Sequence, residues 1–387
     1  MPPRVLHLST VLAVTAACAP ALAAQEVIQS QRHAFRVVTV AEGLENPWSM
    51  AFLPGGDMLI TERPGRLRLV RNGVLQPQPI AGVPAVRARG QGGLLDVVLH
   101  PDFESNRILY LSFSKPRAGG GEGTTAIVRA RYDDDRLTDV VELFEAVAWS
   151  DGGNHFGSRI AFDPDGYMFF TVGDRGVDPF LLEEHPAQHV DNHQGTVNRL
   201  YDDGRVPDDN PFVGQAGALP SIWSYGHRNL QGLAFDRRTG NLWQTEHGPQ
   251  GGDELNLVLP GRNYGWPVIG YGVQYGGRPI HESTAMEGME QPVHYWVPSI
   301  ATSGLMIYDG DAFPEWRGSA FVGGLNGQQL ARVTLDGETA TSEETLLEGV
   351  GRIRDIRQGP DGDIFIAFDD RRGGPSAVVR LEPAGSR

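Results

Sequence analysis

Short apolar runs separated by turn residues recur along most of this chain, and they occur in pairs. Each pair consists of an apolar run, a turn rich in Pro, Asp and Gly, and a second apolar run. Six variants of this unit are present, and they begin at Met50, Val97, Ile160, Leu233, Leu305 and Ile356. Apolar and polar residues alternate within the runs, and this alternation on both sides of a tight turn predicts a β-hairpin.

Several units continue into a further short strand: LRLV after Gly65, IVRARY after Ala126, TVNRLY after Gly195, LARVTL after Gln329 and AVVRLE after Ser376. Three or four short strands per unit, repeated six times, predict an all-β protein, a six-bladed β-propeller with four-stranded antiparallel blades. A tandem of β-sandwiches is the alternative. The spacing between units is uneven, and the extra length follows Gly176 and Gly248. We expect the Gly-, Pro- and His-rich loops there to cover one face.

Composition supports this fold and narrows the range of partners. The chain has 387 residues, which is more than one hydrophobic core usually supports. A propeller avoids this size limit because each blade adds its own layer. Its 50 Gly and 27 Pro favour many turns and few long helices. The formal net charge of −15 argues against nucleic acid and anionic membranes as partners. A local group of arginines is therefore informative in this chain.

The first residues are typical of a signal peptide. Arg4 is followed by an apolar run from Val5 to Ala17, and Ala21-Leu22-Ala23 is a small-x-small cleavage site. We predict a signal peptide over residues 1–24 and a single propeller domain over residues 25–387, periplasmic or secreted and without membrane insertion. Lipidation at Cys18 is the less favoured alternative, because Thr15 stands where a lipobox prefers Leu.

Cys18 is the only cysteine, so cleavage after the signal leaves a chain with no disulfide, no thiolate nucleophile and no zinc–cysteine site. Any catalytic role must then belong to residues other than cysteine. His155, in DGGNHFGSRIAF just before the third unit, lies on a Gly-flanked loop that enters a strand. A neutral imidazole there could act as a general base at the channel mouth. An ordinary hydrogen-bonded loop histidine is the alternative.

Three arginines stand at equivalent strand entrances. Arg228, with Asn229, precedes the fourth unit, and Arg352 and Arg354 precede the sixth at a spacing that puts both on one side of a strand. Such entrances converge in a propeller, and converging guanidinium groups suit a polycarboxylate or a phosphate. Solvated surface arginines are the alternative. Gln91 places an amide on another entrance loop.

The segment EHGPQGGDE indicates a hard cation. Gly248 and Pro249 free two successive carbonyl oxygens, and Asp253 and Glu254 follow with carboxylates. Ca²⁺ accepts such a mixed set of oxygen ligands. The spacing matches neither an EF-hand nor a His-x-x-x-His site, so a turn followed by a solvated acidic pair remains open.

Taken in order, these motifs resemble those of a known family, the soluble quinoprotein glucose/sorbosone dehydrogenases. The chain is most similar to the bacterial aldose sugar dehydrogenases that use pyrroloquinoline quinone (PQQ). The shared motifs run from Gln91 to Arg354: GQGGLLDVVLHPDF, GGNHFGSRIAFDPDGYMFFTVGD, YGHRNLQGLAF, EHGPQGGDELN, NYGWP and GRIRDI. They span most of the chain, and the ordered set is more specific than any one motif.

The resemblance implies PQQ over the central channel and His155 as the base that removes the proton of the sugar C1 hydroxyl. It assigns PQQ contacts to Gln91, Arg228, Asn229, Arg352 and Arg354, and the quinone-polarising Ca²⁺ to the Gly248 and Pro249 carbonyls. Glu254 and Tyr264, with Asp253, match a second, structural Ca²⁺ site, and Tyr275 is a further candidate for the cofactor pocket.

Two positions depart from the better-known glucose enzymes of the family. Asn326 stands where those enzymes carry a lysine against the cofactor, and Asn154 stands where an acid is often found beside the base. We expect altered PQQ affinity and redox tuning from the first and a less basic His155 from the second. Both departures favour the aldose branch of the family over an enzyme specific for glucose.

The sequence thus predicts a PQQ- and Ca²⁺-dependent enzyme that oxidises aldose sugars to lactones and passes electrons to an unknown acceptor, as a monomer or homodimer. Two alternatives remain. A Ca²⁺-dependent lactone hydrolase would hold its metal with carboxylates and Asn and would not need three arginines. A non-catalytic binding propeller would not need His155.

Overall fold

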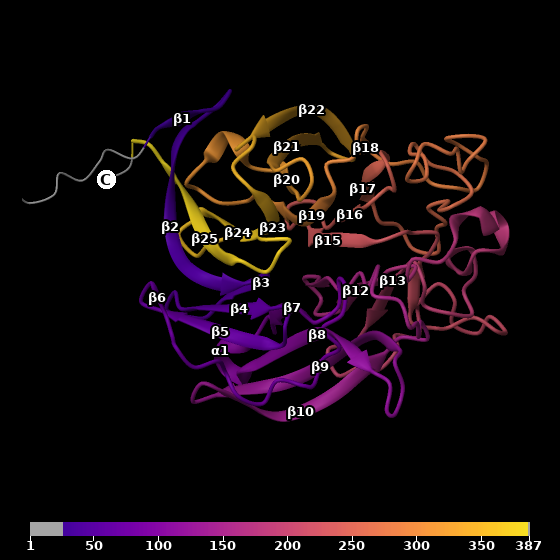
Figure 1. The fold of residues 1–387 in the computed structure, drawn as a ribbon, viewed down its shortest axis with the longest axis horizontal. Helices are drawn as coiled ribbons and strands as arrows, with labels where there is room; N and C mark the ends of the chain where they lie inside the picture. The colour runs from indigo at the N-terminus through magenta and orange to yellow at the C-terminus, as the bar shows by residue number, and fades with distance from the viewer. Residues whose placement is uncertain (1–25, 386–387) are drawn as a thin grey trace, which may run out of the picture.

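The computed structural model describes residues 26–385, whose strands form six antiparallel sheets around a central axis (Figure 1). The prediction of an all-β, six-bladed propeller is confirmed, and the tandem of sandwiches is wrong. The predicted signal peptide, with Cys18, lies outside the described residues. No helix within the described range is long and apolar enough to cross a membrane.

Each predicted hairpin forms the two innermost strands of a blade. The six inner strands contact one another in sequence around the axis, and the last contacts the first. The pairs are β3 (Pro47–Phe52) with β4 (Met58–Glu62), β7 (Leu94–Leu99) with β8 (Ile108–Pro116), β11 (Ile160–Phe162) with β12 (Met168–Val172), β15 (Leu230–Phe235) with β16 (Leu242–Glu246), β19 (Thr302–Ile307) with β20 (Ala320–Gly324), and β23 (Arg352–Gln358) with β24 (Ile364–Asp369).

The third and outer strands complete the blades. They are β5 (Arg66–Arg71) and β6 (Val74–Leu75), β9 (Gly123–Asp133) and β10 (Arg136–Glu145), β13 (Thr196–Leu200) and β14 (Ile222–Ser224), β17 (Asp253–Leu257) and β18 (His294–Trp296), β21 (Gln329–Asp336) and β22 (Thr339–Leu346), and β25 (Pro375–Pro383). The sequence pattern missed β17, because its two leading carboxylates are typical of a turn. The helical elements are short: α1 (Phe103–Asn106) and the 3-10 turns Pro179–Glu184, Pro186–Gln188 and Pro314–Trp316.

The outer strand of the last blade comes from the other end of the chain. β2 (Ala34–Glu45) pairs antiparallel with β25, from Phe35 opposite Pro383 to Glu45 opposite Pro375. Figure 1 shows indigo β2 beside yellow β25, with β1 (Ile28–Gln29) paired to β2. This pairing covers the edge that β25 would otherwise expose and closes the ring. The repeat pattern, which starts at Met50, did not predict it.

Six of the eight apolar clusters among the described residues lie between neighbouring sheets, one for each pair. One cluster packs Met50 and Ile60 of the first blade against Phe365 and Val378 of the last. Each sheet therefore buries both faces, and each strand that packs on both sides is apolar over most of its length, as in Met168–Val172.

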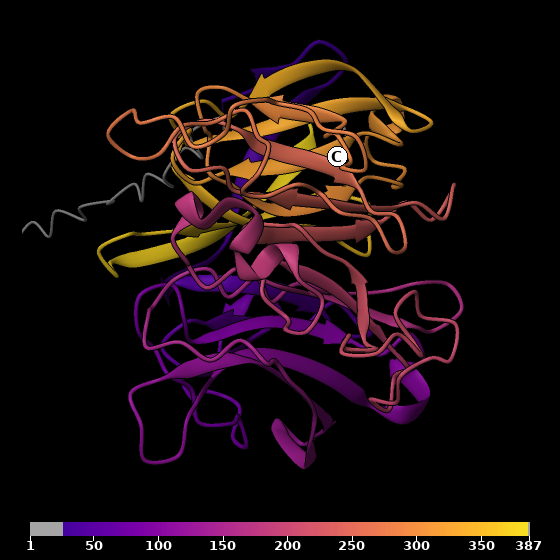
Figure 2. The same cartoon turned by 90° about the vertical axis from the view of Figure 1, so that its right-hand side faces the viewer.

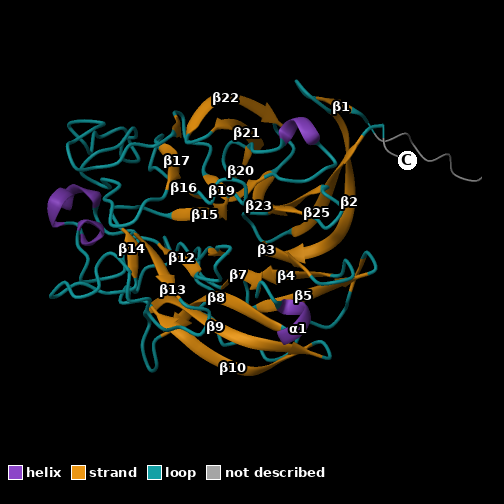
Figure 3. Ribbon diagram, turned by 180° about the vertical axis from the view of Figure 1, so that it is seen from behind, coloured by secondary structure: helices purple, strands orange, loops and turns teal. Residues whose placement is uncertain are grey.

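The long loops gather beside the third and fourth blades (Figures 2 and 3). Residues 173–195 connect β12 to β13, and residues 258–293 connect β17 to β18. The two loops are joined because Gln188 donates to the Trp266 carbonyl at 2.7 Å and accepts from Asn263 at 2.9 Å. The expectation of extra length after Gly176 is confirmed. The extra length expected after Gly248 lies mainly beyond β17.

Candidate functional site

A cavity of about 770 Å³ lies where the loops that lead into the inner strands meet the loops between second and third strands. Its volume is that of a typical small-molecule site. Eight residues predicted from the sequence line it: Gln91, Asn229, Gly248, Pro249, Tyr275, Asn326, Arg352 and Arg354. Tyr275 stands at the rim with 69% of its surface exposed. The convergence expected of a propeller therefore brings most of the predicted polar residues to one place.

His155 lies between two residues that line this cavity, Asn154 and Phe156, and its side chain is 12% exposed. Its Nδ1 is 2.6 Å from Oδ1 of Asp174, the residue that follows β12 and Gly173. Asp174 is 1% exposed and also accepts from the indole of Trp266 at 2.8 Å and from the Gly176 amide at 2.8 Å. His155 is thus half of a buried His–Asp pair.

The electrostatics of the pair fix the tautomer of the imidazole. Burial would raise the pKa of Asp174, but the charge of His155 and its hydrogen bond bring that pKa down to about 2. Asp174 is therefore a carboxylate near neutral pH, and Nδ1 of His155 donates to it. Nε2 is left as the basic nitrogen. Burial lowers the pKa of His155, against the raising effect of Asp174, so the ring is neutral near pH 7.

The backbone that presents His155 is strained and tightly packed. His155 has φ of 51° and Ser158 has φ of 86°, in the left-handed region that side chains avoid. A Cβ on Gly173 would lie 2.4 Å from the His155 carbonyl oxygen, so the loop can approach β12 only because residue 173 is glycine. The Gln91 side chain accepts from the His155 amide at 2.9 Å, which ties the base to a second entrance loop.

Arg352 and Arg354 face the same cavity from β23, as their spacing predicted, and they share one carboxylate. Arg354 lies 3.3 Å and Arg352 3.8 Å from Oδ2 of Asp369. Arg354 also donates to the side chain of Gln231 at 2.9 Å. Burial lowers the pKa of Arg354 to about 10, and Asp369 opposes this shift. One carboxylate for two guanidinium groups leaves this wall positively charged.

Arg228 does not line the large cavity. Its guanidinium donates to the carbonyl oxygens of His247 and Gly248, both at 3.0 Å, and lies 5.1 Å from the centre of the Trp266 ring. Its amide donates to Glu246 at 2.5 Å. Arg228 thus sits behind the loop that carries the predicted cation ligands, between the large cavity and a smaller one.

The wall is suited to an anion and a hard cation. Nε of Arg228 and Nε of Arg352 are buried donors without a hydrogen-bond partner, so they are available to a ligand that supplies acceptors. Nε2 of His247 is also buried without a partner. A Cβ on Gly248 would lie 2.2 Å from the Gly251 carbonyl oxygen, so only glycine allows this tight loop. Among the described residues no three His, Cys, Asp or Glu side chains converge on a metal position, so a cation here would depend on carbonyl oxygens.

A second cavity of about 20 Å³ lies beside the first and is lined by Glu246, Glu254 and Tyr264 among others. Burial, and then repulsion from Glu246, raise the pKa of Glu254 to about 8. The oxygens of Asp253 are turned elsewhere. They accept from the Gly248 amide at 2.9 Å, from the Ser299 hydroxyl at 2.8 Å and from the Thr302 amide at 3.2 Å. Asp253 holds the loop that carries Gly248, and its part in cation binding stays a prediction.

Four contributors to the site were missed by the sequence reasoning: Asp174, Gln231, His247 and Trp266. Asp174 ends the motif TVGD, and a polar residue directly after a buried strand was the available signal. His247 lies within the EHGP segment already singled out, and burial lowers its pKa well below the ordinary value. Nothing in the sequence pairs His155 with Asp174, or Asp174 with Trp266, because these contacts join separate loops.

This chain is similar in sequence and in fold to known proteins. The family model described as Glucose / Sorbosone dehydrogenase matches residues 44–379. Aldose sugar dehydrogenase YliI of Escherichia coli is 43% identical over 343 residues, covering 87% of this chain and 91% of the relative. A crystal structure of a glucose dehydrogenase is 47% identical with a TM-score of 0.84, covering 90% of this chain and 99% of its own. The PQQ-bound form of an aldose sugar dehydrogenase from Streptomyces coelicolor is 31% identical with a TM-score of 0.73, covering 90% and 98%.

The low pKa of Asp174 makes a prediction about stability. Because this pKa of about 2 lies below the ordinary 3.8, the carboxylate stabilises the fold above about pH 4, and that contribution is lost as the pH falls through 2. Asp174→Asn should lower the free energy of unfolding at pH 7 by on the order of 2 kcal/mol, and by less as the pH approaches 2. Denaturant titrations at several pH values measure this. Asp191→Asn, at an exposed position, is the control, and an equal loss in both variants would contradict the prediction.

Proposed function

This chain belongs to the glucose/sorbosone dehydrogenase family, and from that membership we propose that it is a PQQ- and Ca²⁺-dependent aldose sugar dehydrogenase. It would oxidise the C1 hydroxyl of an aldose to the lactone. The observation that carries the proposal is the His155–Asp174 pair beside a cavity with an arginine-lined wall. The pair provides a neutral base, and the wall provides a place for an anionic cofactor.

The residues present fit PQQ, a tricarboxylate. Arg352 and Arg354 would bind its carboxylates through charge-assisted hydrogen bonds, and Gln91, Asn229 and Asn326 would bind its remaining polar atoms. Arg228 and Tyr275 would complete the pocket from behind the loop and from the rim. When bound, the quinone supplies the acceptor for the hydride that leaves C1 of the sugar. Asn326 donates without adding charge, so this wall depends on its arginines for electrostatic attraction.

The carbonyl oxygens of Gly248 and Pro249 would hold the Ca²⁺ that polarises the quinone, since hard oxygen ligands suit this ion. The bond from Arg228 to the Gly248 carbonyl sets the orientation of that peptide. The tight turn folds Gly248 against the backbone of Gly251 and Gly252, and Gly248 and Pro249 themselves line the cavity.

His155 would take the proton of the C1 hydroxyl on Nε2. Asp174 holds Nδ1, keeps Nε2 free and stabilises the imidazolium that forms, because its carboxylate lies 2.6 Å away in a buried setting. Loss of that proton raises the electron density on the C1 oxygen and favours departure of hydride from the same carbon. The packed loop 155–158 holds the base in place for this transfer.

The alternatives fit the site less well. A Ca²⁺-dependent lactone hydrolase would need carboxylates around an axial ion, whereas the cavity wall carries arginines and amides with Asp369 already bonded to Arg354. A binding propeller would have no use for a buried base with a defined tautomer.

Location, assembly and partners also remain proposals. The predicted signal peptide of residues 1–24 would send the protein to the periplasm or the medium, where it would act as a monomer or homodimer. Its substrate is a sugar, and its electron acceptor is unknown.

We further propose that Glu254 and Tyr264 bind a second, structural Ca²⁺ in the 20 Å³ cavity, with Glu246 beside them. A cavity of this size holds one water or ion, and a cation would relieve the repulsion that raises the pKa of Glu254 to about 8. Since that pKa is raised, the metal-free protein should lose stability as the pH rises from about 4.5 to 8.

This site predicts that Ca²⁺ raises the melting temperature of chelated protein more at pH 8 than at pH 5. Ca²⁺ should stabilise the protein most at the pH where Glu254, without the ion, would be a buried carboxylate repelled by Glu246. Glu254→Gln should remove both the pH dependence and most of the response to Ca²⁺, as measured by differential scanning fluorimetry. A Ca²⁺ response that persists unchanged in this variant would remove Glu254 from the site.

The proposed activity is tested by reconstitution. Protein purified with chelator should reduce an artificial dye with an aldose only after PQQ and Ca²⁺ are added together, because the pocket needs the cofactor and the cation completes it. PQQ alone and Ca²⁺ alone are the controls, and a panel of aldoses reports the preferred sugar. If the dye is not reduced when PQQ and Ca²⁺ are both present, the proposal is contradicted.

The role of His155 is tested by His155→Ala. The variant should lose about 10²- to 10⁴-fold in kcat, the usual contribution of a general base, while still binding PQQ. His189→Ala is the control, because His189 is exposed on a neighbouring loop and does not line the cavity. Near-normal turnover in His155→Ala would assign the base elsewhere.

A further inference from the structure

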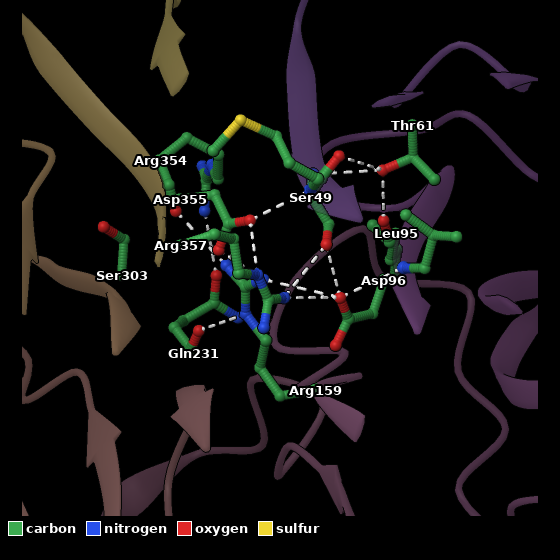
Figure 4. Close-up of polar contacts among 12 residues, drawn as sticks. Ser49, Thr61, Leu95, Asp96, Arg159, Gln231, Ser303, Arg354, Asp355 and Arg357 are labelled. Atoms are coloured by element: carbon green, nitrogen blue, oxygen red, sulfur yellow. Dashed lines mark hydrogen bonds and ion pairs between the residues drawn. The ribbon is translucent and has the colours of Figure 1, made fainter. Parts of the chain in front are cut away.

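Four charged side chains outside the cavity fill the channel along the axis (Figure 4). Asp96 comes from β7, Arg159 immediately precedes β11, and Asp355 and Arg357 come from β23. Asp96, Arg159 and Asp355 are each at most 2% exposed. We call these four residues the channel quartet. The chemistry proposed above uses none of them.

The quartet is neutral overall and closely paired. Arg159 lies 2.8 Å from Asp355 and 3.6 Å from Asp96. Arg357 lies 3.0 Å from the second oxygen of Asp355 and 2.9 Å from Asp96. The backbone amide of Met50 donates to the Asp355 oxygen that Arg357 also contacts, at 3.0 Å. The amide of Ile160 donates to the second oxygen of Asp96, at 2.8 Å. Each carboxylate of the quartet therefore has hydrogen-bond or ion-pair partners from more than one blade.

Arg159 differs from Arg357 in what else it touches. Its Nε donates to the Gln231 carbonyl at 2.7 Å, and its Nη2 donates to the Arg354 carbonyl at 3.2 Å. Its guanidinium lies 4.1 Å from the centre of the Trp48 ring. Gln231, Arg354 and Trp48 all line the cavity, and Arg159 does not. Arg357 instead reaches Ser49 at 3.0 Å, which does not line the cavity either.

Stability alone is a poor reason for this arrangement. Burying two ion pairs costs desolvation energy that their attraction often only balances, and apolar replacements can be as stable. A guanidinium does offer several donors in one rigid plane, which an ammonium does not. That plane lets one side chain bind a carboxylate and two main-chain carbonyls from β15 and β23 together.

We infer that Arg159 is a positioning residue for the cofactor site: it fixes the main chain of Gln231 and Arg354 relative to each other and to Trp48. The side chains of Gln231 and Arg354 are themselves bonded at 2.9 Å, so fixing both backbones fixes the direction in which the Arg354 guanidinium is presented. The inference rests on the proposed function, in which Arg354 binds a carboxylate of PQQ.

A matched pair of variants tests this, Arg159→Lys and Arg357→Lys. Both keep the charge that faces Asp355, and only the first removes the fork that spans Gln231 and Arg354. The dissociation constant of PQQ, measured by fluorescence titration of chelated protein in excess Ca²⁺, should rise by about 10- to 100-fold in Arg159→Lys, the usual effect of losing a supporting contact. Arg357→Lys should bind PQQ nearly as wild type does, and both variants should show similar melting temperatures.

A second comparison separates positioning from general damage. If Arg159 acts through Arg354, the losses of PQQ affinity in Arg159→Lys and Arg354→Lys should not add in the double variant, because the contact being positioned is already gone. Should Arg159→Lys fail to fold, Arg159→Met and Arg357→Met, each combined with Asp355→Asn so that the number of buried charges stays balanced, provide the same comparison.

Three results would overturn the inference. The first is wild-type PQQ affinity in Arg159→Lys, and the second is an equal loss in the Arg159 and Arg357 variants, since either leaves only a structural role. The third is failure of the wild-type protein itself to bind PQQ, which would overturn the proposed function as well. The wild-type titration therefore distinguishes the two failures.

Discussion

The antiparallel pairing of β2 with β25 is the interaction on which the rest of the molecule depends. The apolar clusters join each sheet to its two neighbours, so the six clusters form a closed circuit only if the last blade also packs on the first. With the circuit closed, the six inner strands surround one axis and their entrance loops point to one cavity. Closure therefore helps to fix how the separate sheets that carry His155 and Arg354 face one another across the cavity.

Charge inside this ring is arranged in two layers along the axis. The channel quartet below is balanced, with two carboxylates for two guanidinium groups. The cavity above is unbalanced, because Arg352 and Arg354 share Asp369 alone. An acidic protein thus presents a positive wall in this cavity, and an anionic ligand is drawn there by the local charge rather than by the net charge.

The sequence predicted the elements whose information is local. The period-two runs from Met50 to Ile356 predicted the inner hairpins, and the spacing of Arg352 and Arg354 predicted their common face. Contacts between distant segments could not be predicted in this way. Three contacts join segments whose sequences do not indicate their partners: the His155–Asp174 pair, the closure by β2 and the bonds of Arg159. β17 was missed for a local reason, because Asp253 and Glu254 open a strand where carboxylates favour a turn. Arg228 was predicted to contact the cofactor, but it does not line the large cavity, and the direction of its guanidinium depends on packing against Trp266.

The closure by β2 also has a consequence for how the protein reaches its folded state. In the order of synthesis β2 is among the first strands to appear, and its partner β25 is the last. During synthesis from the amino end, β2 therefore stays without its partner β25 until the end of the chain has been made, and it exposes apolar residues during that time. A truncated chain that lacks β25 keeps open sheet edges, and such edges are recognised by chaperones and proteases.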